Sequence, residues 1–172
     1  MGIKISITII VFASIVWISS IIMDYSIVVP LSKPAPSQRY KLEKGDIFNP
    51  LKNYDFGKGR WTAYLIISRT DFSDLPPALK KGRYLKTTDI ELLRQIRDVW
   101  KFVYTGGDVG TVESVIYFIN DDKIVFQSGI VVDKERVGLQ DKTYGWLEAS
   151  DGLAIVECLQ RFKKIDFPIV LL

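Results

Sequence analysis

The residue types that most often do chemistry in proteins are nearly absent from this chain of 172 residues. It contains no histidine and a single cysteine, Cys158. This excludes an intramolecular disulfide, a zinc site built from Cys and His, and any nucleophilic centre that pairs Ser or Cys with His. A general base would have to be a carboxylate, a lysine or a tyrosine.

Two pairs of carboxylates are the remaining candidates for chemistry. Asp133 and Glu135 follow a short β-rich run, and a base and an acid at a strand end could face one cleft. Asp121 and Asp122 lie where a hairpin turn favours Asn or Asp for backbone reasons. We interpret the first pair as residues of a solvated loop and the second as turn residues. The sequence therefore predicts no catalytic residue, no metal ligand and no cofactor, so we expect the protein not to be an enzyme.

Two further features could suggest a site but have simpler explanations. The glycine-rich segment from Gly106 to Gly110 follows a predicted helix, whereas phosphate loops follow a strand and open a helix. We interpret it as a helix C-terminal cap and turn. Cys158 lies within a second predicted helix, where a small buried residue is the usual explanation.

Charge is distributed unevenly along the chain. Residues 24–104 hold 15 basic and 9 acidic side chains, whereas residues 105–172 hold 7 basic and 11 acidic ones. Basic residues cluster around Tyr84 and on the helix that follows, and Lys101 extends the cluster. We expect one basic face that binds an acidic protein surface, although an ordinary solvated surface is the competing interpretation. A net charge of +3 is too small to favour binding to the phosphate backbone of nucleic acid. We therefore do not expect a nucleic-acid partner.

An aromatic pair around Gly145 is the other candidate contact feature. Tyr144 and Trp146 would anchor a partner if they were exposed, because Tyr and Trp dominate interface hot spots; burial in a core is the commoner outcome. The complete set of predicted partner-binding residues is Lys80, Lys81, Arg83, Tyr84, Lys86, Arg94, Arg97, Tyr144 and Trp146.

The N-terminus predicts a membrane anchor. Ile5 to Met23 are 19 consecutive uncharged residues, about 28 Å of helix. A cleaved signal peptide would have a shorter apolar run followed by a small-x-small site, but the first good pair, Ala35 and Ser37, lies well beyond this run. We therefore predict an uncleaved signal-anchor that contacts the membrane through residues 5–23. A very short basic N-terminal region precedes the apolar run, and the bulk of the protein follows it. This order predicts a single-pass protein of the cell inner membrane whose domain faces the periplasm.

The rest of the chain divides into a tether and a domain. We predict a signal-anchor over 1–23, a Pro-containing tether over 24–47 that resists helix and ladder pairing, and an α+β domain over 48–172.

Local patterns within the domain predict two helices and several strands. Thr88 and Glu91 form a capping box that starts a helix reaching about Phe102. Ser150 or Asp151 caps a second helix, which continues through Phe162 with Leu153 on its buried face. The predicted strands cover 60–68, 111–119, 123–126, 130–132 and 165–172, with 120–122 as a hairpin turn. The fold class is a single small α+β domain with a mostly antiparallel sheet and two helices, preceded by one N-terminal transmembrane helix.

These features favour binding over catalysis. We expect a membrane-anchored extracytoplasmic binding protein, with an immunity-type protein that neutralises a toxin at the membrane as the subclass. One alternative is an envelope or secretion-complex assembly component whose anchor packs through small residues such as Ala13 and Ser14. A hydrolase using Asp133 and Glu135 is the less favoured alternative.

Overall fold

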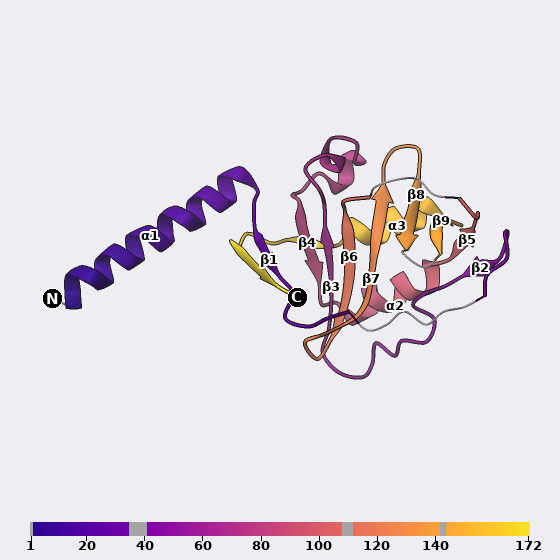
Figure 1. The fold of residues 1–172 in the computed structure, drawn as a ribbon, viewed down its shortest axis with the longest axis horizontal. Helices are drawn as coiled ribbons and strands as arrows, with labels where there is room; N and C mark the ends of the chain where they lie inside the picture. The colour runs from indigo at the N-terminus through magenta and orange to yellow at the C-terminus, as the bar shows by residue number, and fades with distance from the viewer. Residues whose placement is uncertain (1, 35–40, 108–111, 142–143) are drawn as a thin grey trace.

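An antiparallel sheet of nine strands forms the body of the structure, in the order β10-β4-β3-β6-β7-β8-β9-β5-β2 (Figure 1). The computed structural model describes residues 2–34, 41–107, 112–141 and 144–172, with side chains from residue 8 onward. The strands of this sheet are β2 (Ile47–Phe48), β3 (Trp61–Ile66), β4 (Tyr84–Thr87), β5 (Phe102–Tyr104), β6 (Val115–Asn120), β7 (Lys123–Val132), β8 (Val137–Asp141), β9 (Gly145–Ala149) and β10 (Lys163–Lys164). The predicted mixture of helices with a mostly antiparallel sheet is confirmed.

Two helices cover one face of the sheet. They are α2 (Ile90–Val99) and α3 (Gly152–Leu159), and two short 3-10 turns, η1 (Asp71–Ser73) and η2 (Pro77–Leu79), precede β4. Strand β3 alternates between buried and half-buried residues, so Trp61, Ala63 and Leu65 point into the main core. There they join the buried side of α2, represented by Ile96, and of α3, represented by Leu159. The main core therefore lies between the sheet and these helices.

The start of α2 corrects the predicted capping box. The N-cap is Asp89, one residue after Thr88, and its carboxylate accepts hydrogen bonds from the N–H groups of Glu91 and Leu92. An ionised carboxylate caps as well as a hydroxyl and also complements the positive end of the helix dipole. The prediction placed the helix correctly but chose the wrong capping residue.

The end of α2 also differs from the prediction. The helix stops at Val99, and Phe102–Tyr104 forms β5, which pairs with β9. The glycines at 106 and 107 therefore follow a strand, so the helix-cap interpretation is wrong; residues 108–111 lie outside the described residues. Long-range pairing overrides local helix pattern here because Phe102 gains a buried position in the main core.

The second predicted helix starts correctly but buries a different face. The Asp151 carboxylate accepts from the N–H of Ala154 and caps α3. Leu153, predicted to be buried, is 79% exposed, while Ile155 and Leu159 pack in the core. The helix ends at Leu159 rather than Phe162. An eight-residue helix has room for little more than two turns, so its buried face is set by where it meets α2 and β8 and not by an extended apolar stripe.

A small parallel ladder covers the other face of the sheet. Its strands are β1 (Ile27–Val29) and β11 (Ile169–Leu171). Val28 and Val170 point towards the sheet and join a second buried cluster with Tyr84, Ile119 and Ile124. Part of the sheet is therefore covered on both faces.

This ladder corrects one expectation about the segment 24–47. Residues 27–29 pair with β11, and Ile47 begins the short strand that pairs with β5, so the segment does not resist ladder pairing throughout. β-branched Ile and Val outweigh the neighbouring Pro30, which follows the last paired residue and costs no ladder hydrogen bond. The division of the chain into anchor, tether and domain stays a prediction.

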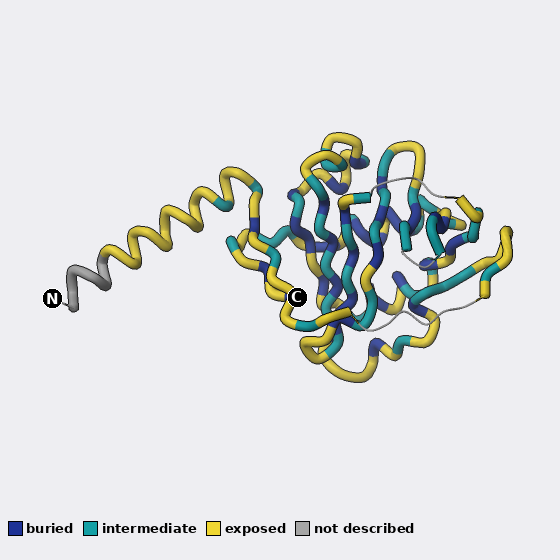
Figure 2. Tube along the Cα trace, viewed as in Figure 1, coloured by how far each residue is buried: buried dark blue, intermediate teal, exposed yellow. Residues whose placement is uncertain are grey.

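Helix α1 (Gly2–Met23) projects away from the sheet on the side where β1 lies (Figure 1). Its side chains from residue 8 to residue 23 are exposed almost throughout (Figure 2). Among the residues whose side chains the structure describes, no helix is both long enough and apolar enough to cross a membrane.

Candidate functional site

The candidate catalytic pair, Asp133 and Glu135, lies in the turn between β7 and β8. One Asp133 carboxylate oxygen accepts hydrogen bonds from the N–H groups of Glu135 (2.7 Å) and Arg136 (2.6 Å). This is a turn-stabilising geometry that aspartate commonly adopts in loops. Glu135 is exposed, and the structure gives it no side-chain contact with Asp133. The two carboxylates are not arranged as an acid and a base across a cleft.

A hollow of about 180 Å³ beside this turn brings Asp133 near Asp71 and Asp74. One Asp71 carboxylate oxygen accepts from both the N–H (3.1 Å) and the hydroxyl of Ser114, which fixes the loop before β6 to η1. Asp71 is therefore occupied in holding two loops together. Within the described part of the chain, no group of three or more His, Cys, Asp or Glu residues is placed to hold a metal ion.

Asp121 and Asp122 form the turn of the β6–β7 hairpin, as predicted. Both have positive φ, 47° and 63°, which suits the two central residues of a tight hairpin turn. Asp122 accepts a hydrogen bond from the Arg60 guanidinium at 2.8 Å, and Asp121 accepts one from the Arg60 N–H at 2.9 Å. These carboxylates hold the turn against the start of β3.

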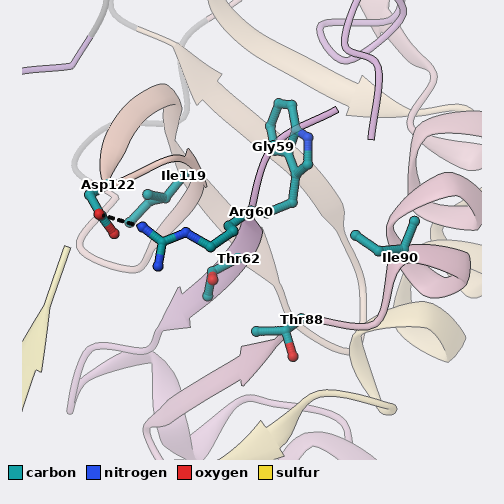
Figure 3. A pocket seen from close by; sticks show the side chains of 8 residues that line it. Gly59, Arg60, Thr62, Thr88, Ile90, Ile119 and Asp122 are labelled. Carbon is teal, nitrogen blue, oxygen red and sulfur yellow. Dashed lines mark hydrogen bonds and ion pairs between the residues drawn. The ribbon is translucent and has the colours of Figure 1, made fainter. Parts of the chain in front are cut away.

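A second hollow, of about 370 Å³, lies beside this ion pair and between β3, β6 and the start of α2 (Figure 3). Arg60 extends across it towards Asp122, while Thr62, Thr88 and Ile90 complete its wall. None of the predicted partner-binding residues lines it. Among the described residues that line it, the charged side chains are Arg60 and Asp122, which are exposed and paired with each other.

The predicted basic residues do not share one surface. Lys86 lies opposite Tyr64 in the β3–β4 ladder and points to the face covered by β1 and β11. Its neighbour Leu85 points to the other face and packs with α2, which carries Arg94 and Arg97. The sheet therefore separates Lys86 from the basic residues of α2.

The remaining members of the basic set have partners of their own. The Lys80 ammonium donates to the Ser73 carbonyl, and that of Lys81 donates to the Gln160 carbonyl after α3. The Arg83 Nε donates to the Ile67 carbonyl at 3.2 Å. On α2, Arg94 pairs with Glu91 and Arg97 with Asp98, which lowers the free positive charge of that helix.

Three aromatic members of the predicted set are largely enclosed. Tyr84 is 4% exposed and Trp146 is 6% exposed. Trp146 lies across Gly138 of the neighbouring strand, where an added Cβ would come within 2.2 Å of its ring. Tyr144 is half-buried, with its ring centroid 5.5 Å from that of Phe48. Burial, the commoner outcome for an aromatic pair, is therefore observed for Trp146 and in part for Tyr144.

Cys158 is buried in α3, as predicted. Burial is the main cause that raises the pKa of its thiol, and the nearby Arg161 opposes this only in part. A raised pKa lowers the thiolate fraction and hence the reactivity.

The sequence patterns missed a surface formed by β1 and β11. Register places Ile27 opposite Ile169 and Val29 opposite Leu171, all on the side of the ladder away from the sheet. All four are exposed. The sequence does contain two short runs of branched residues, Ile27–Val29 and Ile169–Leu171. Nothing in the local sequence shows that these two runs pair with each other.

Comparisons with known proteins do not place the chain in a family. No family model matches it, and neither the curated proteins nor the solved structures contain a significant match.

Proposed function

We propose that the chain is a single-pass, membrane-anchored binding protein, with α1 as the anchor and the α+β domain held at the periplasmic face of the inner membrane. The observation that carries the proposal is the surface of α1. From residue 8 to residue 23 its large apolar side chains are exposed on all sides. A helix that is apolar all round is stable only when a membrane or another protein covers it.

The length of the helix supports the same conclusion. Twenty-two residues make about 33 Å of α-helix, and the hydrocarbon core of a bilayer is about 30 Å thick. The anchor in this proposal is the uncharged run at 5–23 of the sequence.

Contacts at the end of α1 support a fixed connection between anchor and domain. The Asp24 carboxylate accepts from the Arg83 N–H at 2.7 Å and pairs with Lys164 at 3.5 Å. The Ser26 hydroxyl donates to the Phe167 carbonyl at 2.7 Å. Because these bonds begin directly after the helix, the domain would sit at the membrane surface and not at the end of a long free spacer.

The hydrogen bonds of the acidic side chains favour binding over catalysis. Asp71, Asp121 and Asp133 each hold a loop or turn, so none is free to act as a general base. An immunity-type role remains the specific form of the proposal. An acidic partner could approach either of two separate basic surfaces, one near Lys80, Lys81 and Arg83 and one on α2.

Replacement of two residues in α1 tests the anchor. Phe12→Lys with Ile15→Lys should release the full chain from membranes washed with carbonate, because each lysine near the helix centre costs about 2.5 to 3.5 kcal/mol. Leu153→Lys is the control, since it places a lysine at an exposed apolar site in the domain. A double variant that stays in the membrane fraction would contradict the anchor. Alkaline phosphatase fused after Leu172 should be active; an inactive fusion would contradict the outward orientation.

Two charge-reversal variants test partner binding and locate it. The first combines Lys80→Glu, Lys81→Glu and Arg83→Glu, and the second combines Arg94→Glu and Arg97→Glu. With the full chain as bait, a partner that docks electrostatically should associate at least about tenfold more slowly with one variant and normally with the other. Lys123→Glu, at an exposed position of the β6–β7 hairpin, is the control for a charge reversal outside both surfaces. An association rate that changes neither with salt concentration nor in either variant would refute an acidic partner.

A further inference from the structure

The ladder of β1 and β11 lies close to the end of the proposed anchor. Three residues, 24–26, connect Met23 at the end of α1 to Ile27 at the start of β1, and four Cα–Cα steps limit the separation of these two ends to about 14 Å. The ring of Trp17, in the last two turns of α1, meets the ring of Phe167 before β11 at 5.5 Å, edge to face. Figure 1 shows α1 leaving the molecule on the side where this ladder lies.

The side of the ladder away from the sheet is apolar and uncovered. Ile27 and Leu171 are each 53% exposed, and Ile169 is 43% exposed. Leu31 and Phe167 extend the surface at either end. The alternate residues, such as Val170, are buried against the sheet, so the ladder is firmly held while its outer side chains stay exposed among the described residues. We call Ile27, Val29, Leu31, Phe167, Ile169 and Leu171 the ladder surface.

Basic side chains lie on the strands of the sheet face that the ladder covers. Lys163 lies opposite Lys86 across the β4–β10 ladder, and both are exposed. The segments that form and flank this region are 24–34, 83–87, 119–124 and 163–172, where the hairpin segment 119–124 packs against the ladder. They hold six basic and four acidic side chains. Lys164 pairs with Asp24 and Asp166, so the exposed basic side chains of the region are represented by Lys86 and Lys163.

We propose that the ladder surface rests on the membrane from which α1 emerges, with its apolar side chains at the headgroup boundary and its basic rim on anionic lipid. An apolar patch flanked by lysines is the arrangement that binds the interface of an anionic bilayer. Lipid is chosen over a protein partner because the patch is continuous with α1 through the Trp17–Phe167 contact. This inference rests on the proposed anchor, and it adds that the domain lies on the bilayer in a fixed orientation.

A dye attached at single positions of the full chain tests this surface. In a Cys158→Ala background, one variant carries Ile169→Cys in the ladder surface, and a second, Leu171→Cys, guards against loss of folding in the first. Leu153→Cys is the control on α3, and Val16→Cys reports the anchor itself. Each variant is placed in vesicles of phosphatidylcholine with and without phosphatidylglycerol, and quenching by lipids with a nitroxide near the headgroup or deep in the acyl chain is measured.

The dye at 169 or 171 should be quenched by the headgroup nitroxide, and the dye at 153 should not. Lys86→Gln and Lys163→Gln should each lower the ratio of docked to undocked domain about fivefold in vesicles with phosphatidylglycerol. They should have little effect in phosphatidylcholine alone.

The outcomes that overturn the inference are separate from those that overturn the anchor. If the dye at 16 is quenched by the deep nitroxide but those at 169 and 171 are not, the ladder surface does not meet lipid while the anchor stands. If the dye at 16 is not quenched, the proposed anchor itself fails. The dyes at 169 and 171 are also compared in detergent at several protein concentrations. If they become less accessible to solvent as the protein concentration rises, a second copy of the chain covers the surface and the lipid assignment is wrong.

Discussion

Gly138→Ala should strongly destabilise the domain, because Trp146 occupies the space that a side chain at 138 would need. An ideal Cβ at this position would lie 2.2 Å from Cη2 of Trp146 and 2.5 Å from the Leu147 carbonyl oxygen. The first contact could be relieved if the ring moved. The second involves the backbone of the adjacent strand β9, and an ordinary carbon–oxygen separation there would require the strands to part by about 0.9 Å.

The structure sets the size of the effect. Parting β8 from β9 by that amount would stretch normal ladder hydrogen bonds beyond the usual limit of about 3.2 Å, and each bond contributes about 0.5 to 1.5 kcal/mol. Overpacking of the ring adds about 1 to 3 kcal/mol. We therefore expect the free energy of unfolding to fall by about 3 kcal/mol. For a domain of this size the thermal midpoint should fall by about 10 °C.

The assay is thermal unfolding of the full chain in detergent, followed by near-UV circular dichroism. Gly107→Ala is the matched control, because among the described residues its added Cβ would meet the Thr105 hydroxyl alone, at 3.5 Å, an ordinary contact. Combining Gly138→Ala with Trp146→Ala should cost at least about 1 kcal/mol less than the sum of the two single changes. A Gly138→Ala midpoint within about 2 °C of the parent would refute the reasoning. It would mean that Trp146 leaves its slot easily, and so could serve as an exposed contact residue after all.

Three further predictions follow from single side chains. Asp151→Ala removes the N-cap of α3 and should lower the free energy of unfolding by about 1 kcal/mol in urea titrations, whereas Asp151→Asn should cost clearly less. The Cys158 thiol, with its pKa raised by burial, should react with a disulfide reagent only slowly until urea unfolds the domain; fast reaction in the native protein would contradict its burial. Burial raises the pKa of Tyr64 and Tyr117, so the stability that their neutral forms provide is complete below about pH 10 and is lost as pH rises through their folded-state pKa values. Replacing both with Phe should therefore reduce the loss of stability as the pH rises above about 10, and an unchanged loss would show that burial does not raise these pKa values.

Sequence patterns located the elements whose signals are local. The hairpin turn at Asp121 and Asp122 was predicted correctly, because a two-residue turn between β-rich runs has a strong residue preference. Strand β3 and the start of α3 were found for the same kind of reason, as alternation and a capping aspartate are visible within a few residues. The composition alone excluded centres that depend on histidine.

Tertiary structure decided which surfaces those elements share. Residues close in sequence, such as Lys86 and Arg94, are separated by the sheet, because successive residues of a strand point to opposite faces. Residues at opposite ends of the chain, such as Ile27 and Ile169, become direct neighbours through a parallel ladder that joins segments about 140 residues apart. Such pairing is chosen by the area buried against the rest of the domain, a quantity that no short stretch of sequence contains.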